Sequence, residues 1–80
     1  MSKFIYDFDF KYKVDENGYY HNINAPAVIY DNGDKYWYHH GRQHRTDGPA
    51  IEYYNGEVEY WVNGRYYKSL EEGLMEEALK

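Results

Sequence analysis

The densest group of potential metal ligands in the sequence is a histidine-rich segment in the middle of the chain. His39, His40 and His44, followed by Asp47, offer the imidazole and carboxylate groups that bind zinc. His39 and His40 are adjacent, and because successive side chains of a strand point to opposite faces, we expect these two to diverge. His44 and His21 occupy equivalent positions of an internal repeat, which favours a structural hydrogen bond. We therefore predict neither a metal site nor a cofactor.

Catalytic groups of other kinds are scarce. Asp7 and Asp9 fall on one face of a predicted strand, about 7 Å apart by strand geometry, which is within the range of glycosidase carboxylates. A chain of 80 residues offers no evident sugar cleft, and its aliphatic hydroxyls are only Ser2, Thr46 and Ser69. No nucleophile–base–acid set is evident, and the glycines occur singly instead of forming a phosphate-binding loop. The sequence therefore predicts a protein that is not an enzyme.

Aromatic residues are the remaining candidates for function. The chain has 12 Tyr, 3 Phe and 2 Trp, and Tyr and Trp are enriched in the buried centres of protein interfaces. Adjacent tyrosines at 19–20, 53–54 and 66–67 must place one ring of each pair on either face of a sheet. Either a partner protein covers the outward rings, or a dimer or the C-terminal helix buries them. The predicted contact residues are Tyr36, Trp37, Tyr38, Tyr54, Tyr60, Trp61, Asp7, Asp9 and Arg42.

The overall composition restricts the partners. The formal net charge of −5 disfavours direct binding of nucleic acids, which depends on Lys and Arg, and is compatible with docking onto a basic surface. The first residues lack the pattern of a signal peptide, and no apolar run approaches the roughly 18 residues that span a bilayer. The chain has no cysteine, so a reducing compartment is suitable. We expect a soluble, intracellular protein without a membrane partner.

Regularly spaced Asn-Gly dipeptides indicate the fold. With one His-Gly member, the set comprises Asn17-Gly18, Asn32-Gly33, His40-Gly41, Asn55-Gly56 and Asn63-Gly64. Asn-Gly between alternating apolar residues is typical of type I′ hairpin turns, in which both central residues have positive φ. A shift of 23 residues aligns Pro26-Ala27 with Pro49-Ala50 and Tyr30 with Tyr53, which indicates a repeated unit. We predict a mainly β protein, an antiparallel β-meander of hairpin repeats of roughly 23 residues.

The best-defined unit has expected strands at residues 27–31, 34–39 and 42–45, a link at 46–49, and a following strand at 50–54. In the link, we expect Arg45 to pair with Asp47 or with an acidic residue of a neighbouring unit. Pro26 and Pro49 precede their strands, as expected for a residue that cannot donate to a ladder.

The two ends of the chain differ from the repeats at residues 18–67. Residues 1–17 alternate apolar and charged side chains from Phe4 to Val14, which predicts one long, half-buried strand. Residues 69–80 predict a short helix, with Ser69 as N-cap and Glu72 reaching back. Gly73 costs this helix about 1 kcal/mol relative to Ala, so the helix must pack on the sheet or form a dimer contact. Its expected apolar face consists of Leu70, Leu74, Met75, Ala78 and Leu79.

The segment from Trp37 to Ala50 resembles a known family. It is similar to the MORN-like repeats of tailed bacteriophages and large DNA viruses, whose units read W-Y-x-x-G-x-x-H-R-x-D-G-P-A before a strand and N-G. The resemblance is close over residues 37–56 and partial over 18–36, where Asn22 and Asn24-Ala25 replace the Arg and Asp-Gly of the motif. It ends after Gly64. The resemblance implies a phage accessory protein that acts in the host cell cytoplasm, and such proteins often bind and inhibit host machinery.

Three functions remain open from the sequence. The first is a non-enzymatic phage protein that binds and modulates a host protein, such as a bacterial defence component, through an aromatic and acidic sheet surface. The second is a self-assembling structural protein, in which open sheet edges pair between copies. The third is a DNA mimic that occupies the basic groove of a nucleic-acid-binding host protein, with phosphates imitated by Asp7, Asp9, Asp31, Asp34, Glu52, Glu57 and Glu59.

Overall fold

The computed structural model describes residues 3–80, and the first two residues of the predicted N-terminal strand lie outside this described part. The described residues form β1 (Ile5–Tyr6), β2 (Phe10–Tyr12), β3 (Val28–Tyr30), β4 (Lys35–Tyr36), β5 (Tyr38–His39), β6 (Arg42–Gln43), β7 (Ile51–Glu52), β8 (Val58–Val62), β9 (Arg65–Tyr67) and α1 (Leu70–Ala78). Seven strands make one antiparallel sheet in the order β1-β2-β3-β4-β7-β8-β9, and β5 pairs with β6. The predicted β-meander with a C-terminal helix is confirmed.

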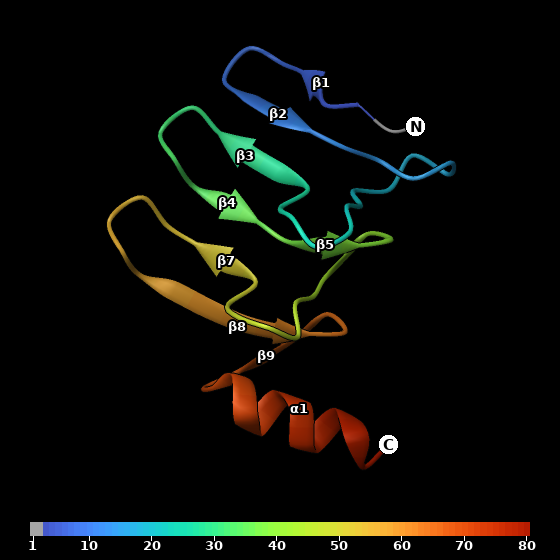
Figure 1. Cartoon of the computed structure of the whole chain (residues 1–80), viewed down its shortest axis with the longest axis vertical. Helices are drawn as coiled ribbons and strands as arrows, with labels where there is room; N and C mark the ends of the chain where they lie inside the picture. The colour runs from blue at the N-terminus through green and yellow to red at the C-terminus, as the bar shows by residue number, and fades with distance from the viewer. Residues whose placement is uncertain (1–2) are drawn as a thin grey trace.

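The sheet is a single layer. Its hairpins follow one another down the long axis of the molecule, and α1 lies at the C-terminal end (Figure 1). The extents are 38 × 31 × 16 Å, and the seven strands of the main sheet are hydrogen-bonded neighbour to neighbour in one order. The apolar core is accordingly small. Its buried members are Ala27, Val28, Ala50, Ile51 and Val62.

Hydrogen bonds repeat along the chain with the predicted shift of 23 residues. The His40 amide donates to His21 Nδ1, and the Asn63 amide donates to His44 Nδ1. The same shift relates the backbone bonds Gly41 N to Tyr20 O and Gly64 N to Gln43 O, and also Ala27 N to Tyr36 O and Ala50 N to Glu59 O. The predicted structural role of His21 and His44 is therefore confirmed, because both hold a tight turn of the next hairpin.

The Asn-Gly turns are of two kinds, and the prediction of type I′ turns throughout was wrong. Both central residues have positive φ only at His40-Gly41 and Asn63-Gly64. At the other three sites the glycine alone has positive φ, and Gly33 shows the pattern: its amide donates to Tyr30 O, while Tyr30 N donates to Asp34 O. This is the three-residue hairpin loop in which a glycine forms a bulge. The Gly33 and Gly56 turns lie at the left of Figure 1, whereas the Gly18 turn lies at the opposite side of the sheet together with the His40-Gly41 and Asn63-Gly64 turns.

The N-terminal segment is a hairpin, so the prediction of one long strand was wrong. β1 pairs with β2 in the register Ile5 to Tyr12, and the chain reverses between them at residues 7–9. The Asp7 amide donates to Phe10 O, and Asp7 Oδ1 accepts from the Phe8 amide at 2.6 Å. Asp side chains favour turns by such local bonds, which here outweigh the alternation of apolar residues. Asp7 and Asp9 therefore lie in a turn and not on one strand face.

The predicted strand at 34–39 is interrupted at Trp37, which separates β4 from β5. The Trp37 amide donates to Ala50 O, and its carbonyl accepts from the His44 amide. β4 can therefore pair with β3 and β7, while β5 pairs with β6. In the next repeat β8 makes both sets of contacts in one continuous strand, with β7 through its first half and with β9 through its second.

The helix packs through a side that the sequence did not indicate. Ser69 caps it as predicted, with Oγ accepting from the Glu72 amide, while Glu72 Oε1 reaches back to the Lys68 amide. Gly73 is the buried residue of α1, and Leu74, Met75 and Leu79 of the expected apolar face are exposed. A Cβ at position 73 would lie 2.9 Å from both Val62 and Tyr67 side-chain atoms. Glycine is therefore what allows the helix to lie close against β8 and β9.

We expect the substitution Gly73→Ala to lower stability, although Ala is the better helix former by about 1 kcal/mol. The added methyl group cannot fit without shifting Val62 or Tyr67, and such overpacking costs about 1–3 kcal/mol. The net loss of about 1 kcal/mol should lower the unfolding temperature by roughly 4–8 °C. Glu76→Ala, at an exposed position of the same helix, is the control and should leave the unfolding temperature unchanged or higher. An increase with Gly73→Ala would contradict this packing.

Candidate functional site

Three hairpin loops lie side by side where the strands end, at the left of Figure 1. They comprise residues 7–9, 31–34 and 54–57, and we call them the acidic loop edge. Each hairpin is two strands wide, so successive loops are about 10 Å apart. The three loops contain no Lys or Arg, and their acidic residues are Asp7, Asp9, Asp31, Asp34 and Glu57.

The acidic loop edge is held together by hydrogen bonds between loops and exposes two aromatic rings. The Asp31 amide donates to Asp9 O at 3.0 Å, and the Tyr54 amide donates to Asp34 Oδ1 at 2.8 Å. Phe8 is 96% exposed and Tyr54 is 70% exposed. Carboxylates and aromatic rings are thus presented together on a fixed backbone, which suits contact with a basic protein surface.

One face of the sheet carries a connected group of seven rings, which we call the aromatic face. Neighbouring ring centroids are 5.1–6.4 Å apart, within the usual range for aromatic pairs. Cross-strand pairs place the rings beside Val28 and Ile51 of the core, and the rings shield both from water. The members are Phe10, Tyr12, Tyr20, Tyr30, Tyr36, Tyr38 and Tyr53.

The hydroxyl groups of the aromatic face are partly desolvated. Burial raises the pKa of Tyr20, Tyr36 and Tyr38 above the usual value. Burial and a hydrogen bond to the Glu59 carboxylate raise the pKa of Tyr53 to about 12. These phenols are therefore neutral at physiological pH. Because every ring of the face is half-buried, its first role is to complete the core of a single-layer sheet.

The predicted contact residues are divided among these surfaces. Tyr54, Asp7 and Asp9 lie together on the acidic loop edge, whereas Tyr36 and Tyr38 belong to the aromatic face. Tyr60 and Trp61 are half-buried on β8, and Trp61 Nε1 donates to the Glu59 carboxylate. Trp37 lies against the Arg45 guanidinium, 4.0 Å from the ring centroid, and Arg42 is exposed at the opposite edge of the sheet.

Phe8 is the exposed residue that sequence reasoning missed. Alternation assigned it to the packed face of a long strand, yet it lies at the tip of the first hairpin loop. The flanking Asp7 and Asp9 were the available signal, because paired Asp residues are common in turns. The tyrosine pairs followed expectation: Tyr19, Tyr54 and Tyr66 are exposed, and their partners Tyr20, Tyr53 and Tyr67 are half-buried.

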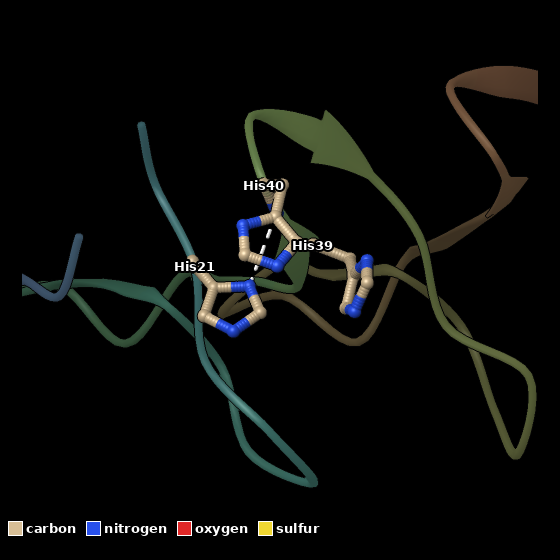
Figure 2. A group of neighbouring side chains, drawn as sticks. All are labelled: His21, His39 and His40. Carbon is tan, nitrogen blue, oxygen red and sulfur yellow. Dashed lines mark hydrogen bonds between the residues drawn. The ribbon is translucent and has the colours of Figure 1, made fainter. Parts of the chain in front are cut away.

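Figure 2 shows that His21, His39 and His40 lie close together. His39 and His40 belong to the β5–β6 hairpin, which lies at the side of the sheet opposite the acidic loops (Figure 1). The rings of His21 and His40 stack with centroids 3.9 Å apart, and His39 lies edge-on to both at 4.9 and 4.7 Å. The predicted divergence of His39 and His40 was therefore wrong. His40 has a φ of 48°, which is outside strand geometry and turns its ring back over the hairpin. His40 Nδ1 also lies 2.6 Å from Asp15 Oδ2, and this hydrogen bond lowers the pKa of Asp15.

One ring nitrogen from each of His21, His39 and His40 lies within 4.8 Å of the other two, but the chemistry of these rings does not suit a metal ion. His21 Nδ1 accepts from a backbone amide, so the ring proton of neutral His21 is on Nε2, and neither nitrogen is free as a ligand. The stacked rings of His21 and His40 are inclined by only 16°, so their lone pairs lie in nearly parallel planes and cannot converge on one ion. The cluster is better suited to holding turns and responding to protons.

A pocket of about 340 Å³ lies beside the histidines, and its lining residues come from segments 22–24, 37–39 and 44–47. Its lining residues include Trp37, Tyr38, His39 and His44, and Ile23, which also lines it, is 70% exposed. The remaining lining residues are Asn22, Asn24, Arg45, Thr46 and Asp47. Its volume is at the lower end of the range for small-ligand sites, and it can accept one or two side chains.

Comparison with protein families, with curated proteins and with solved structures finds no match to this chain. The fold and surfaces define it as a single-layer antiparallel β-meander with an acidic loop edge and a histidine-rich opposite edge. Within residues 3–80, the structure contains no helix of the length and apolar character required to cross a membrane.

Proposed function

We propose that this chain is a non-enzymatic protein-binding module that docks its acidic loop edge onto a basic surface of a partner protein. The observation that carries the proposal is the grouping of five carboxylates and two exposed aromatic rings on three adjacent loops without a basic residue. Complementary charge steers association and sets orientation, while buried aromatic rings supply most of the affinity. Phe8 and Tyr54 are therefore the expected anchors.

The resemblance of residues 37–56 to phage repeat proteins makes a host protein the partner in this proposal. The chain would act as a phage accessory protein that modulates or inhibits that host protein, such as a bacterial defence component, in the host cytoplasm. The acidic loop edge supports this interpretation better than the aromatic face does. The rings of the aromatic face are half-buried against one another, whereas Phe8 and Tyr54 stand free.

Affinity purification from bacterial lysate, followed by mass spectrometry, tests the proposal. The loop variant carries Asp9→Asn, Asp31→Asn and Glu57→Gln, and the control variant carries Glu16→Lys and Asn17→Lys at exposed positions elsewhere. Both variants have the same net charge, so non-specific electrostatic effects are matched. We expect the loop variant to capture roughly tenfold less partner, since the loss of three exposed charge pairs at about 0.5 kcal/mol each adds up to about the 1.4 kcal/mol that corresponds to a tenfold change.

Two results would argue against this function. Equal capture by the loop and control variants would remove the acidic loop edge as the contact surface. Recovery of the bait alone would remove the host partner. A third variant, with Phe8→Ser and Tyr54→Ser, separates the two components of binding: it should weaken capture in high salt, where charge steering is screened.

The grouping of carboxylates on the acidic loops supports DNA mimicry as a second candidate. Five of the seven carboxylates assigned to that function lie on the loops, while Glu52 pairs with Arg45 and Glu59 accepts from Tyr53 and Trp61. The loops recur about every 10 Å, which is sparser than the phosphates of one strand at about 3.4 Å. Displacement of a captured protein by duplex DNA would support mimicry, and its retention would favour an ordinary protein interface.

A further inference from the structure

The hairpin at β5–β6 and the hairpin formed by the second half of β8 with β9 are structurally equivalent. Their pairings, Tyr38 with Gln43 and Trp61 with Tyr66, differ by the repeat shift of 23 residues. The shift relates Val62 of the last hairpin to His39, Asn63 to His40, and Tyr67 to His44. A surface used for packing in one repeat therefore has a counterpart in the other.

In the last repeat, this surface is covered by α1. Gly73 approaches the side chains of Val62 and Tyr67, and the Glu77 carboxylate accepts hydrogen bonds from the Tyr67 hydroxyl and from Asn63 Nδ2. The bond from Tyr67, with those from Lys80 and Asn63, lowers the pKa of Glu77 to about 2. The surface is thus a receptor for a helix that carries a carboxylate.

In the preceding repeat, the counterpart is the pocket lined by His39 and His44. His44 takes the place of the Tyr67 phenol, and His39 takes the place of Val62 and adds a second imidazole to the pocket. His44 Nδ1 accepts from the Asn63 amide, so neutral His44 carries its proton on Nε2 and can donate. Trp37 and Ile23 supply apolar surface beside these donors. The pocket therefore offers the two features that bind α1, an apolar contact and N–H donors for a carboxylate.

The outer side of α1 has the matching chemistry. Met75 and Leu79 are 62% and 80% exposed, Leu74 is also exposed, and the contacts of α1 with β8 and β9 leave them unpartnered among the described residues. The exposed carboxylates of Glu71 and Glu76 flank these side chains. An apolar stripe of this kind beside free carboxylates is the chemistry that the pocket accepts.

We propose that the outer side of α1 of one copy docks into the β5–β6 pocket of a second copy, with a glutamate carboxylate of the helix held by the imidazole N–H groups. The contact joins two different surfaces, so it is heterologous and allows copies to assemble head to tail. It goes beyond host binding, because it uses neither Phe8 nor any acidic loop. Assembly would present the acidic loop edge several times and raise its avidity for a partner with repeated sites.

Sedimentation equilibrium tests the proposal with the full chain between about 10 µM and about 1 mM, the range in which a small interface of this type associates. We expect the average mass of the unaltered protein to rise with concentration. The helix variant carries Met75→Ser and Leu79→Ser, the pocket variant carries Ile23→Asp and His39→Asp, and each should be monomeric. Mixed in equal amounts, they should form a dimer and nothing larger, because one intact helix face then meets one intact pocket.

Folding of each variant is confirmed by circular dichroism, and Ile23→Asp alone replaces the double pocket variant if that variant unfolds. Phe8→Ser is the matched control, because it removes an exposed apolar side chain outside both surfaces and should leave assembly unchanged. A monomer at the highest concentration would overturn the proposal. So would a mixture of the two variants that stays monomeric, which would indicate a symmetric contact. Neither result would affect capture of a host protein by the acidic loop edge.

Discussion

Acidification from about pH 7.5 to about pH 5 is expected to lower the free energy of unfolding by about 2 kcal/mol, at roughly 1 kcal/mol for each hydrogen bond lost. The two bonds are those in which His21 and His44 accept a backbone amide through Nδ1. A protonated imidazole has no acceptor, so each protonation breaks the bond that holds the next tight turn. The unfolding temperature should fall by roughly 10 °C for a chain of this size.

The direction of this effect follows from the pKa of the two imidazoles. Burial and the neighbouring rings of His40 and His39 lower the pKa of His21, while Asp15 and Glu16 oppose the shift. Burial and His39 lower the pKa of His44, while Glu77 opposes the shift. The unfolded chain, with a His pKa of about 6.5, therefore takes up protons before the folded chain does. The contribution of the two hydrogen bonds to the free energy of unfolding is therefore complete above about pH 6.5. It is lost as the pH falls through the lower pKa values that His21 and His44 have in the folded chain.

Urea unfolding at a series of pH values measures the effect. The double variant His21→Asn and His44→Asn is the control, because the Asn amide oxygen can accept the same backbone hydrogen bonds and does not titrate in this range. We expect the double variant to show little change between about pH 7.5 and about pH 5, although Asp15 and the other histidines are retained. Equal stability of the unaltered protein at both pH values would show that the histidine bonds do not support the fold.

Replacement of Arg45 by Met should cost about 3 kcal/mol, the largest effect we expect from a single substitution. Its guanidinium stacks on Trp37 at 4.0 Å and donates to Asp47, to the Pro49 carbonyl and to Glu52. The sequence left Asp47 and an acidic residue of a neighbouring unit as alternative partners of Arg45, and the structure shows both. Arg45 thus joins the link to both adjacent strands, and Met would leave the Pro49 carbonyl and Glu52 without their donor.

Urea unfolding of three variants separates the contributions at this position. Arg45→Lys keeps the charge but loses the planar group that stacks and donates in several directions, so we expect it to recover less than half of the loss. Asp47→Ala removes an exposed partner, whose side chain is 77% accessible, and should cost less than about 1 kcal/mol. A small chain has a total stability of only about 4–12 kcal/mol, so Arg45→Met should remain folded but close to the threshold. A loss no larger than that of Asp47→Ala would show that the Trp37 and Glu52 contacts contribute little.

Local chemistry explains what could be predicted from the sequence. Ser69 begins the helix because a side-chain oxygen can accept the orphan amide of Glu72, and this depends only on neighbours in the chain. The 23-residue repeat of His21 and His44 indicated a shared structural bond, since two equivalent units place equivalent residues alike. The positive φ of Gly33 and Gly56 also followed from residue type, because glycine carries no Cβ penalty there.

Only the tertiary structure decided which surfaces are free. Alternation in the sequence could not distinguish a strand residue from Phe8 at the tip of a loop, because both follow the same period of two. The apolar residues of α1 could not be assigned to the core from their spacing, since the space that Gly73 leaves beside Val62 and Tyr67 set the side on which the helix packs. The acidic residues likewise form one surface only because the fold places their three loops side by side. Residue type and spacing therefore determined the turns, the repeat and the helix cap, because these features depend on short-range interactions. The acidic loop edge and the outer side of α1 instead depend on packing between segments that are far apart in the chain.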